Sequence, residues 1–266
     1  MDVFLEVNIM DIKNKVVWVT GAASGIGRAT AEMFFQKGAK LLGTDIQEEL
    51  GKEVVAQFGE RGLFIKADVT STEESQKAIA AAKGKWGSID ILINCAGYTR
   101  TYPVVTQDGP GPLEPFVKEI NIDLIGAYDV ARLAGFEMTK NKPNDLGERG
   151  AIIQIASMAA ITSNSLISGY ATAKAGLVHL TDILACAYAD YGIRCNCILP
   201  GYIRTAITES PEQNPFIDIS KDIDFNLFPK KVGEPDVIAS ACVFMVENTY
   251  INKTGLKVDA GFKLRS

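Results

Sequence analysis

A tyrosine and a lysine stand four residues apart in the stretch GYATAKAG, residues 169–176. On a helix, positions four apart share one face, with Cβ atoms about 5 to 6 Å apart, so the phenol of Tyr170 and the ammonium of Lys174 would be neighbours. An ammonium stabilises a phenolate and lowers the phenol pKa, which is about 10 when unperturbed. Such a pair can serve as a general base near neutral pH. The same spacing also fits a packed tyrosine beside a solvated lysine.

A glycine-rich turn offers a second kind of chemistry. The stretch VVWVTGAASGIGRATAEMF sets Gly21, Gly25 and Gly27 between a β-type run and an amphipathic helical pattern, with Ser24 among them. A glycine turn that opens a helix presents backbone N–H groups and the positive end of the helix dipole to a pyrophosphate. The alternative is a tight turn that uses glycine for its geometry. The spacing is GxxxGxG, which differs from the common GxGxxG pattern of dinucleotide-binding turns.

The second predicted strand ends at Asp45, where an acidic residue can accept hydrogen bonds from an adenosine ribose. A carboxylate there also repels a 2′-phosphate. The neighbouring positions Ile46 and Ala23 supply no cation to attract that phosphate. The sequence therefore favours NAD over NADP as the cofactor. The alternative is that Asp45 only caps the helix expected from Gln47, a role that is compatible with ribose binding.

The fold that positions these residues is predicted by short β-rich runs that alternate with helix-length segments. The expected strands cover residues 16–20, 40–45, 63–68, 89–94, 151–156 and 193–199, and the expected helices lie near 26–37, 47–58, 72–86, 113–140 and 169–190. Such alternation produces right-handed βαβ crossovers and a parallel sheet. The strands are apolar nearly throughout, as expected when helices cover both faces. We expect an α/β fold: one Rossmann-like, doubly wound domain over residues 1–266, with a mostly parallel sheet flanked by helices.

Composition excludes several classes of partner. The net charge of −5 argues against a nucleic-acid or anionic-membrane surface, and no window has the 18 or more apolar residues of a membrane span. The N-terminal stretch lacks the basic region of a secretory signal. One histidine, His179, and five cysteines without CxxC spacing predict no metal site. Free thiols favour a cytoplasmic location.

Four motifs occur in order: TGAASGIG at 20–27, NCAG at 94–97, YATAK at 170–174 and PGYIRT at 200–205. Together they resemble the short-chain dehydrogenase/reductase family in its short subgroup, with a likeness that extends from about residue 12 to 263. The resemblance implies hydride transfer between a secondary alcohol, or its ketone, and NAD. It also implies a homotetramer, with the two longest predicted helices as candidate interfaces.

The resemblance further implies a catalytic set of Asn121, Ser157, Tyr170 and Lys174. Tyr170 would take or give the hydroxyl proton, and Lys174 would lower the pKa of that tyrosine and bind the nicotinamide ribose. Ser157 would hydrogen-bond the substrate oxygen, and Asn121 would hold a water that connects Lys174 to solvent. The pair in GYATAKAG is then a base and the cation that tunes it.

The resemblance also assigns residues to the cofactor. They are Gly21, Ser24, Gly25, Ile26, Gly27, Asp45, Asp68, Val69, Asn94, Ala96, Gly97, Tyr170, Lys174, Pro200, Gly201, Ile203 and Thr205. Three positions depart from the family pattern. Ala156 stands where a second serine is frequent, Cys95 where a second asparagine is frequent, and Ala260 replaces the first glycine after the strand in LKVDAGF.

The substrate stays open at this stage. Two long proline-containing segments, 98–115 and 204–231, are the expected substrate loops, and the stretch 206–231 is expected to close over bound substrate. One alternative is a carbonyl reductase acting on an acyl or polyketide-type ketone. Another, from a different class, is a regulatory protein that binds NAD without turnover.

Overall fold

The computed structural model describes residues 9–162, 164–209, 224 and 226–263. Their main sheet has seven strands in the order β3-β2-β1-β4-β7-β8-β9, and every neighbouring pair is parallel. The strands are β1 (Val16–Thr20), β2 (Lys40–Asp45), β3 (Gly62–Lys66), β4 (Ile91–Asn94), β7 (Gly150–Ile155), β8 (Ile193–Pro200) and β9 (Gly255–Val258). The predicted doubly wound α/β fold is confirmed. The prediction of one domain over residues 1–266 reaches beyond the described residues and stays a prediction.

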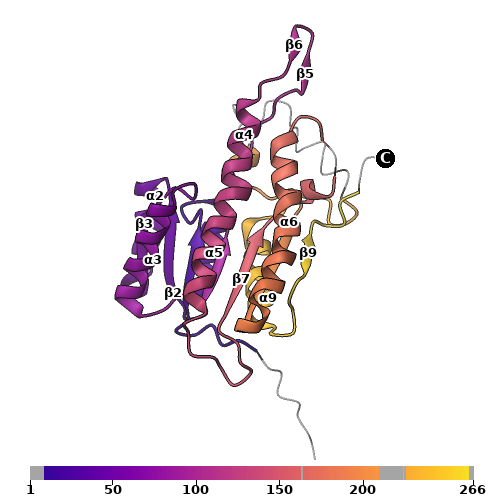
Figure 1. The fold of residues 1–266 in the computed structure, drawn as a ribbon. Coiled ribbons are helices and arrows are strands. Elements are labelled where there is room, and N and C mark those ends of the chain that lie inside the picture. Colours follow the sequence, from indigo (N-terminus) through magenta and orange to yellow (C-terminus); the bar gives the residue numbers. More distant parts are fainter. Residues whose placement is uncertain (1–8, 163, 210–223, 225, 264–266) are drawn as a thin grey trace, which may run out of the picture.

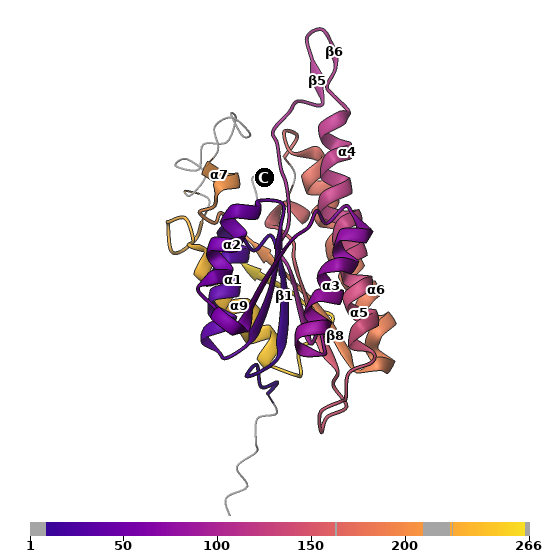
Figure 2. The ribbon, with the colours of Figure 1, turned by 90° about the vertical axis from the view of Figure 1, so that its left-hand side faces the viewer.

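Helices cover both faces of this sheet, with α1, α2 and α9 on one side and α3, α5 and α6 on the other (Figures 1 and 2). The helices and helical turns are α1 (Gly25–Gln36), α2 (Glu48–Ala56), η1 (Gly59–Arg61), α3 (Thr72–Trp86), α4 (Glu114–Ile120), η2 (Asn121–Gly126), α5 (Ala127–Met138), η3 (Met158–Ala160), α6 (Ser168–Tyr188), η4 (Ala189–Tyr191), α7 (Ala206–Glu209) and α9 (Pro235–Glu247). None of the described helices is long and apolar enough to cross a membrane.

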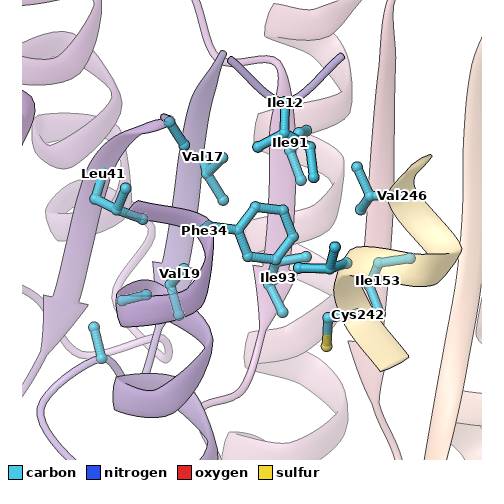
Figure 3. Close-up of a cluster of buried hydrophobic side chains, with 14 of the residues drawn as sticks. Ile12, Val17, Val19, Phe34, Leu41, Ile91, Ile93, Ile153, Cys242 and Val246 are labelled. Carbon is cyan, nitrogen blue, oxygen red and sulfur yellow. The ribbon is translucent and has the colours of Figure 1, made fainter. Parts of the chain in front are cut away.

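The alternation of side chains along each strand divides the core into two layers. Val17 and Val19 of β1 pack with Phe34 of α1, whereas Val16 and Trp18 belong to the cluster on the opposite face. Figure 3 shows the first cluster, with the Phe34 ring among the side chains of β1, β4 and α9. Because both layers are fully apolar, the strands read as continuous hydrophobic runs.

The sequence region predicted as one helix over 113–140 is a column of three parts, α4, η2 and α5 (Figure 1). The middle part, η2, is a π-helical turn, which has more residues per turn than an α-helix and so changes which side chains face inward. Ahead of α4, the predicted loop holds a small hairpin of β5 (Val105–Thr106) and β6 (Gly109–Pro110). The predicted substrate-covering stretch 206–231 lies largely outside the described residues.

Candidate active site

The carboxyl ends of the strands gather the predicted site residues at one edge of the sheet. The strand order reverses between β1 and β4, and in open parallel sheets ligands bind outside the strand ends at such a point. Thr20 and Asn94 are register partners there, and the Thr20 hydroxyl donates to Asn94 Oδ1 at 2.7 Å. The same Thr20 oxygen accepts from the amides of Cys95 and Ala96, which fixes the turn after β4.

The glycine turn has the geometry of an anion cradle. Gly21 and Gly25 adopt φ values of +65° and +52°, which strain other residues, and a Cβ on Gly27 would lie 2.0 Å from the Gly21 carbonyl oxygen. Helix α1 begins at Gly25, and its N-cap Ser24 makes no side-chain capping bond. The first amides of α1 therefore remain available to a pyrophosphate, so this turn fits a dinucleotide.

Asp45 connects the glycine turn to the start of α2. Its Oδ2 accepts from the Ala23 amide at 3.0 Å and its Oδ1 from the Gln47 amide at 2.9 Å, so the carboxylate is held from both sides. The next side chain, Ile46, is 62% exposed. The parallel register also sets Lys66 of β3 opposite Asp45. A cation at this place was not predicted from the sequence. The Lys66 ammonium lies 3.8 Å from Glu48 Oε2.

Tyr170 and Lys174 lie in the first turns of α6, as the helical spacing predicted. The Lys174 ammonium is 5.5 Å from the centre of the Tyr170 ring and donates to the Ile155 carbonyl at 2.9 Å. It also forms an ion pair with Asp123, Nζ to Oδ1, at 3.0 Å. Lys174 is buried, whereas Tyr170 is half-buried. The pair therefore consists of a half-buried phenol beside a fixed, buried cation.

Ser157 reaches the same place from the end of β7. Its backbone is extended and caps the short turn η3, with Oγ accepting from the Ala159 amide at 3.1 Å. The hydroxyl of Ser157 also lies near the Tyr170 side chain and lowers the pKa of its phenol. The structure thus brings Ser157, Tyr170 and Lys174 together.

Asn121 does not join them. It is exposed at the start of η2 and lines a groove on the outer face of α4, η2 and α5 together with Asp68 and Val69. Asp123, two residues further on, is fully buried and occupies the position beside Lys174 that the sequence analysis gave to Asn121. Residues two apart on a helix point to nearly opposite sides, about 200° apart, so only one of them can face the lysine. Sequence reasoning missed Asp123; its spacing to Gly126, another buried residue of η2, was the available signal.

Burial is the largest influence on the pKa of Tyr170 and raises it. Lys174 and Ser157 lower that pKa, but the carboxylates of Asp123 and Glu119 raise it, and the net direction is upward. Burial is the largest influence on the pKa of Lys174 and lowers it, but Asp123, Tyr170 and Cys95 together raise that pKa by more, so the lysine stays an ammonium. The predicted effect of the cation on the pKa of Tyr170 is present, but the carboxylates of Asp123 and Glu119, which the sequence did not predict at this place, oppose it.

Glu119 and Tyr102 support the start of α6, a role that the sequence did not reveal. The Gly169 amide donates to the Tyr102 hydroxyl at 3.0 Å, and that hydroxyl donates to Glu119 Oε2 at 2.8 Å. The Glu119 carboxylate also lies near the Tyr170 amide. The N-cap residue Ile167 provides no side-chain cap. The Gly169 amide in the first turn of α6 is therefore satisfied by a residue outside the helix.

The remaining predicted cofactor residues lie around this edge in different environments. Asn94 is buried and donates to the Ala127 carbonyl at 3.0 Å, so its side chain ties β4 to α5. Thr205 packs against the glycine turn, since a Cβ on Gly25 would be 3.2 Å from its methyl group. Also at the strand ends or in the segments that follow them are Ile26, Asp68, Val69, Ala96, Gly97, Pro200, Gly201 and Ile203. Within the described residues no group of three or more His, Cys, Asp or Glu side chains could hold a metal ion.

The fold and this site define a dinucleotide-binding α/β protein, and comparisons with known proteins narrow the class. A family model described as Enoyl-(Acyl carrier protein) reductase matches residues 21–263. The 3-hydroxyacyl-CoA dehydrogenase type-2 of Drosophila melanogaster is 33% identical, covering 95% of this chain and 99% of its own. The L-rhamnose 1-dehydrogenase (NAD(P)(+)) of Azotobacter vinelandii is 32% identical, covering 93% and 96%. A crystal structure of 3-hydroxyacyl-CoA dehydrogenase type-2 from Mycobacterium avium superposes with a TM-score of 0.87 at 32% identity, covering 95% and 96%.

The chain belongs to the short-chain dehydrogenase/reductase family. It is an oxidoreductase that transfers hydride between a secondary alcohol, or the matching ketone, and a nicotinamide cofactor. Its resemblance to the family, first indicated by four short motifs, is confirmed over nearly the whole chain.

Proposed function

We propose that this protein is an NAD-dependent alcohol dehydrogenase and ketone reductase in which Tyr170 is the general acid and base. The observation that carries the proposal is the meeting of a half-buried phenol, a buried ammonium and a serine hydroxyl at the edge of the sheet that also bears the glycine turn. Bound NAD supplies the nicotinamide carbon that accepts hydride from the alcohol. The protein's own side chains handle the proton and the charge on the substrate oxygen.

The proton follows a short path. In oxidation, the Tyr170 phenolate removes the hydroxyl proton of the alcohol, and in reduction the phenol returns it to the oxygen of the ketone. Ser157 hydrogen-bonds the same oxygen and steadies its developing charge. Lys174 stabilises the phenolate and, as the family resemblance implies, would bind a ribose hydroxyl of the cofactor. No metal is needed in this scheme, because the phenol and the serine act directly on the substrate oxygen.

The preference for NAD over NADP rests on Asp45. Its carboxylate is fixed by two backbone amides at the end of β2 and would accept hydrogen bonds from a ribose while repelling a 2′-phosphate. Lys66 is the nearby cation, and its ammonium is directed toward Glu48. The exposed neighbour Ile46 offers a phosphate no charge.

The test of the catalytic role is Tyr170→Phe, which keeps the ring and removes the hydroxyl. Turnover should fall by a factor of about 10² to 10⁴, while the fold and the affinity for NAD persist. Steady-state kinetics, NAD titration and circular dichroism measure these three quantities. Tyr191→Phe is the matched control, since Tyr191 is exposed at the far end of α6, and it should leave turnover unchanged. A Tyr170→Phe enzyme with near-normal turnover would refute the proposal.

The substrate class is the second open question. Similarity to the 3-hydroxyacyl-CoA dehydrogenases favours a 3-hydroxyacyl thioester or its ketone, and similarity to L-rhamnose 1-dehydrogenase favours a sugar hydroxyl. We rank the acyl substrate first because the relatives that carry that name extend over 95% or more of this chain. A panel of hydroxyacyl thioesters, sugars and cyclic alcohols at fixed NAD separates the two. Activity on none of them would favour a regulatory protein that binds NAD without turnover.

We also propose a cytoplasmic homo-oligomer, with a tetramer as the family resemblance suggests. All five cysteines are free thiols, which supports a reducing compartment. Large apolar side chains are exposed along the outer face of α4, η2 and α5, at Leu113, Val117, Ile125, Tyr128 and Phe136. An exposed apolar stripe of this kind suits contact with a second copy of the chain.

A further inference from the structure

A buried carboxylate faces the buried ammonium of the proposed active site. The side chain of Asp123 is fully enclosed and that of Lys174 is 5% exposed, and their charged atoms are 3.0 Å apart. The other oxygen of Asp123 accepts from the Tyr98 amide at 3.1 Å, and Lys174 donates to the Ile155 carbonyl. The close approach depends on Gly97, because a Cβ there would lie 2.7 Å from Asp123 Oδ1. The turn after β4 therefore shapes the ion pair: Gly97 leaves room for the Asp123 carboxylate, and the Tyr98 amide holds it.

We propose that Asp123 is a positioning residue that holds the Lys174 ammonium and cancels much of its field at Tyr170, so that the tyrosine stays a phenol through the neutral range. This inference rests on the proposed role of Tyr170. It makes the protein a proton donor at neutral pH, suited to ketone reduction. Oxidation of the alcohol would then rise in alkaline solution.

The charge balance of the cluster gives the physical reason. Burial raises the pKa of Asp123, while the Lys174 ammonium at 3.0 Å and the Tyr98 amide lower it and hold the carboxylate charge. With Asp123 ionised, the ion pair is neutral, and forming a phenolate adds an uncompensated negative charge to a buried site. With a neutral amide at the same position, Lys174 would keep its full positive charge and the phenolate would complete a neutral pair. Removing the carboxylate therefore favours loss of the tyrosine proton.

Three other groups face the pair from neighbouring elements: Glu119 acts in the same direction as Asp123, Ser157 acts against it, and Cys95 carries no charge. Glu119 of α4 raises the pKa of Tyr170, and Ser157, after β7, lowers it. Burial raises the pKa of Cys95, after β4, to about 12, so it faces Lys174 as a neutral thiol. Asp123 ranks above Glu119 among the charges that raise the pKa of Tyr170.

The decisive experiment is Asp123→Asn, which keeps the shape and removes the charge. In the protein without cofactor, near-ultraviolet absorbance follows phenolate formation during a pH titration. Subtracting the same titration of Tyr170→Phe, in each background, isolates Tyr170 from the other seven of the eight tyrosines. We expect the first proton of the Tyr170–Lys174 pair to leave at a pH lower by about one unit or more in Asp123→Asn. The kcat/KM profile for alcohol oxidation should move to the acid side by the same amount.

Controls separate charge tuning from damage to the fold. Asp190→Asn makes the same chemical change at an exposed position beyond α6 and should move neither profile. Asp123→Ser removes the charge with a smaller side chain and should reproduce the acid shift if Asp123→Asn folds poorly. An unmoved phenolate titration in a folded Asp123 variant would overturn the inference while leaving Tyr170 as the base. In that outcome, Tyr170→Phe loses both the phenolate titration and turnover, whereas Asp123→Asn shows no shift of the titration. Retained turnover in Tyr170→Phe would instead refute the proposed function.

Discussion

At the scale of single residues, Tyr170 is governed by one cation and two acids. Lys174 alone would make the phenol a base near neutral pH, but Asp123 and Glu119 share the same buried region and act against it. A lysine four residues after a tyrosine therefore does not by itself determine the pKa of that tyrosine. The charges that reach the pair from α4 and η2 decide in which pH range it works.

Cofactor choice is also decided at this scale. Replacing Asp45 with alanine and Ile46 with arginine removes the repulsion of a 2′-phosphate and adds a bidentate partner for it. The ratio of kcat/KM for NAD to that for NADP should fall by about tenfold or more, which corresponds to ~1.4 kcal/mol. Steady-state kinetics with both cofactors measure the ratio.

Lys66→Ala is the matched control for cofactor choice. This cation lies opposite Asp45 in the sheet but extends toward Glu48. Its loss should leave the preference for NAD unchanged. Equal kcat/KM for NAD and NADP in the unaltered protein would contradict the assignment of Asp45.

At the scale of elements, α6 depends on α4 and on the segment before it. The Gly169 amide donates to the Tyr102 hydroxyl, and that hydroxyl donates to the Glu119 carboxylate. A carboxylate near a helix N-terminus also complements the helix dipole. Because these bonds hold the first turn of α6, they fix the backbone that carries the proposed base.

Tyr102→Phe tests this support. The change leaves the Gly169 amide without its acceptor and Glu119 without one donor, so the free energy of unfolding should fall by about 1 to 3 kcal/mol. Turnover should fall as well, because Tyr170 is held less firmly. Urea unfolding and steady-state kinetics measure the two effects, with the exposed Tyr191→Phe as control. Unchanged stability would show that the capping bonds contribute nothing measurable.

At the scale of the whole molecule, the exposed apolar stripe along α4, η2 and α5 predicts contact between copies of the chain. Phe136→Glu places a charge in that stripe and should shift the protein to a smaller assembly, measured by light scattering during size-exclusion chromatography. Leu50→Glu in α2 is the control, because it changes an exposed apolar side chain, 46% exposed against 60% for Phe136, on the opposite face of the sheet. An unaltered mass for Phe136→Glu would exclude this face from the interface.

The sequence by itself determined the features that depend on short spacings. Three such features lie where their local patterns predicted: the glycine turn, the end of β2 at Asp45, and the helical neighbours Tyr170 and Lys174. Each depends only on residues that are close together in the sequence, within one or two neighbouring elements. Alternating apolar runs and helices also determined the parallel sheet, since a strand covered on both faces has few other solutions.

Only the tertiary structure decided which distant side chains meet at these positions. The π-helical turn η2 rotates Asp123 inward and Asn121 outward, and a sequence that offers both residues does not specify that rotation. The strand register brings Lys66 opposite Asp45, and packing of α4 against α6 brings Glu119 to the start of α6. Contacts between residues far apart in the chain depend on register and helix rotation, where a shift of one residue turns a side chain toward another face.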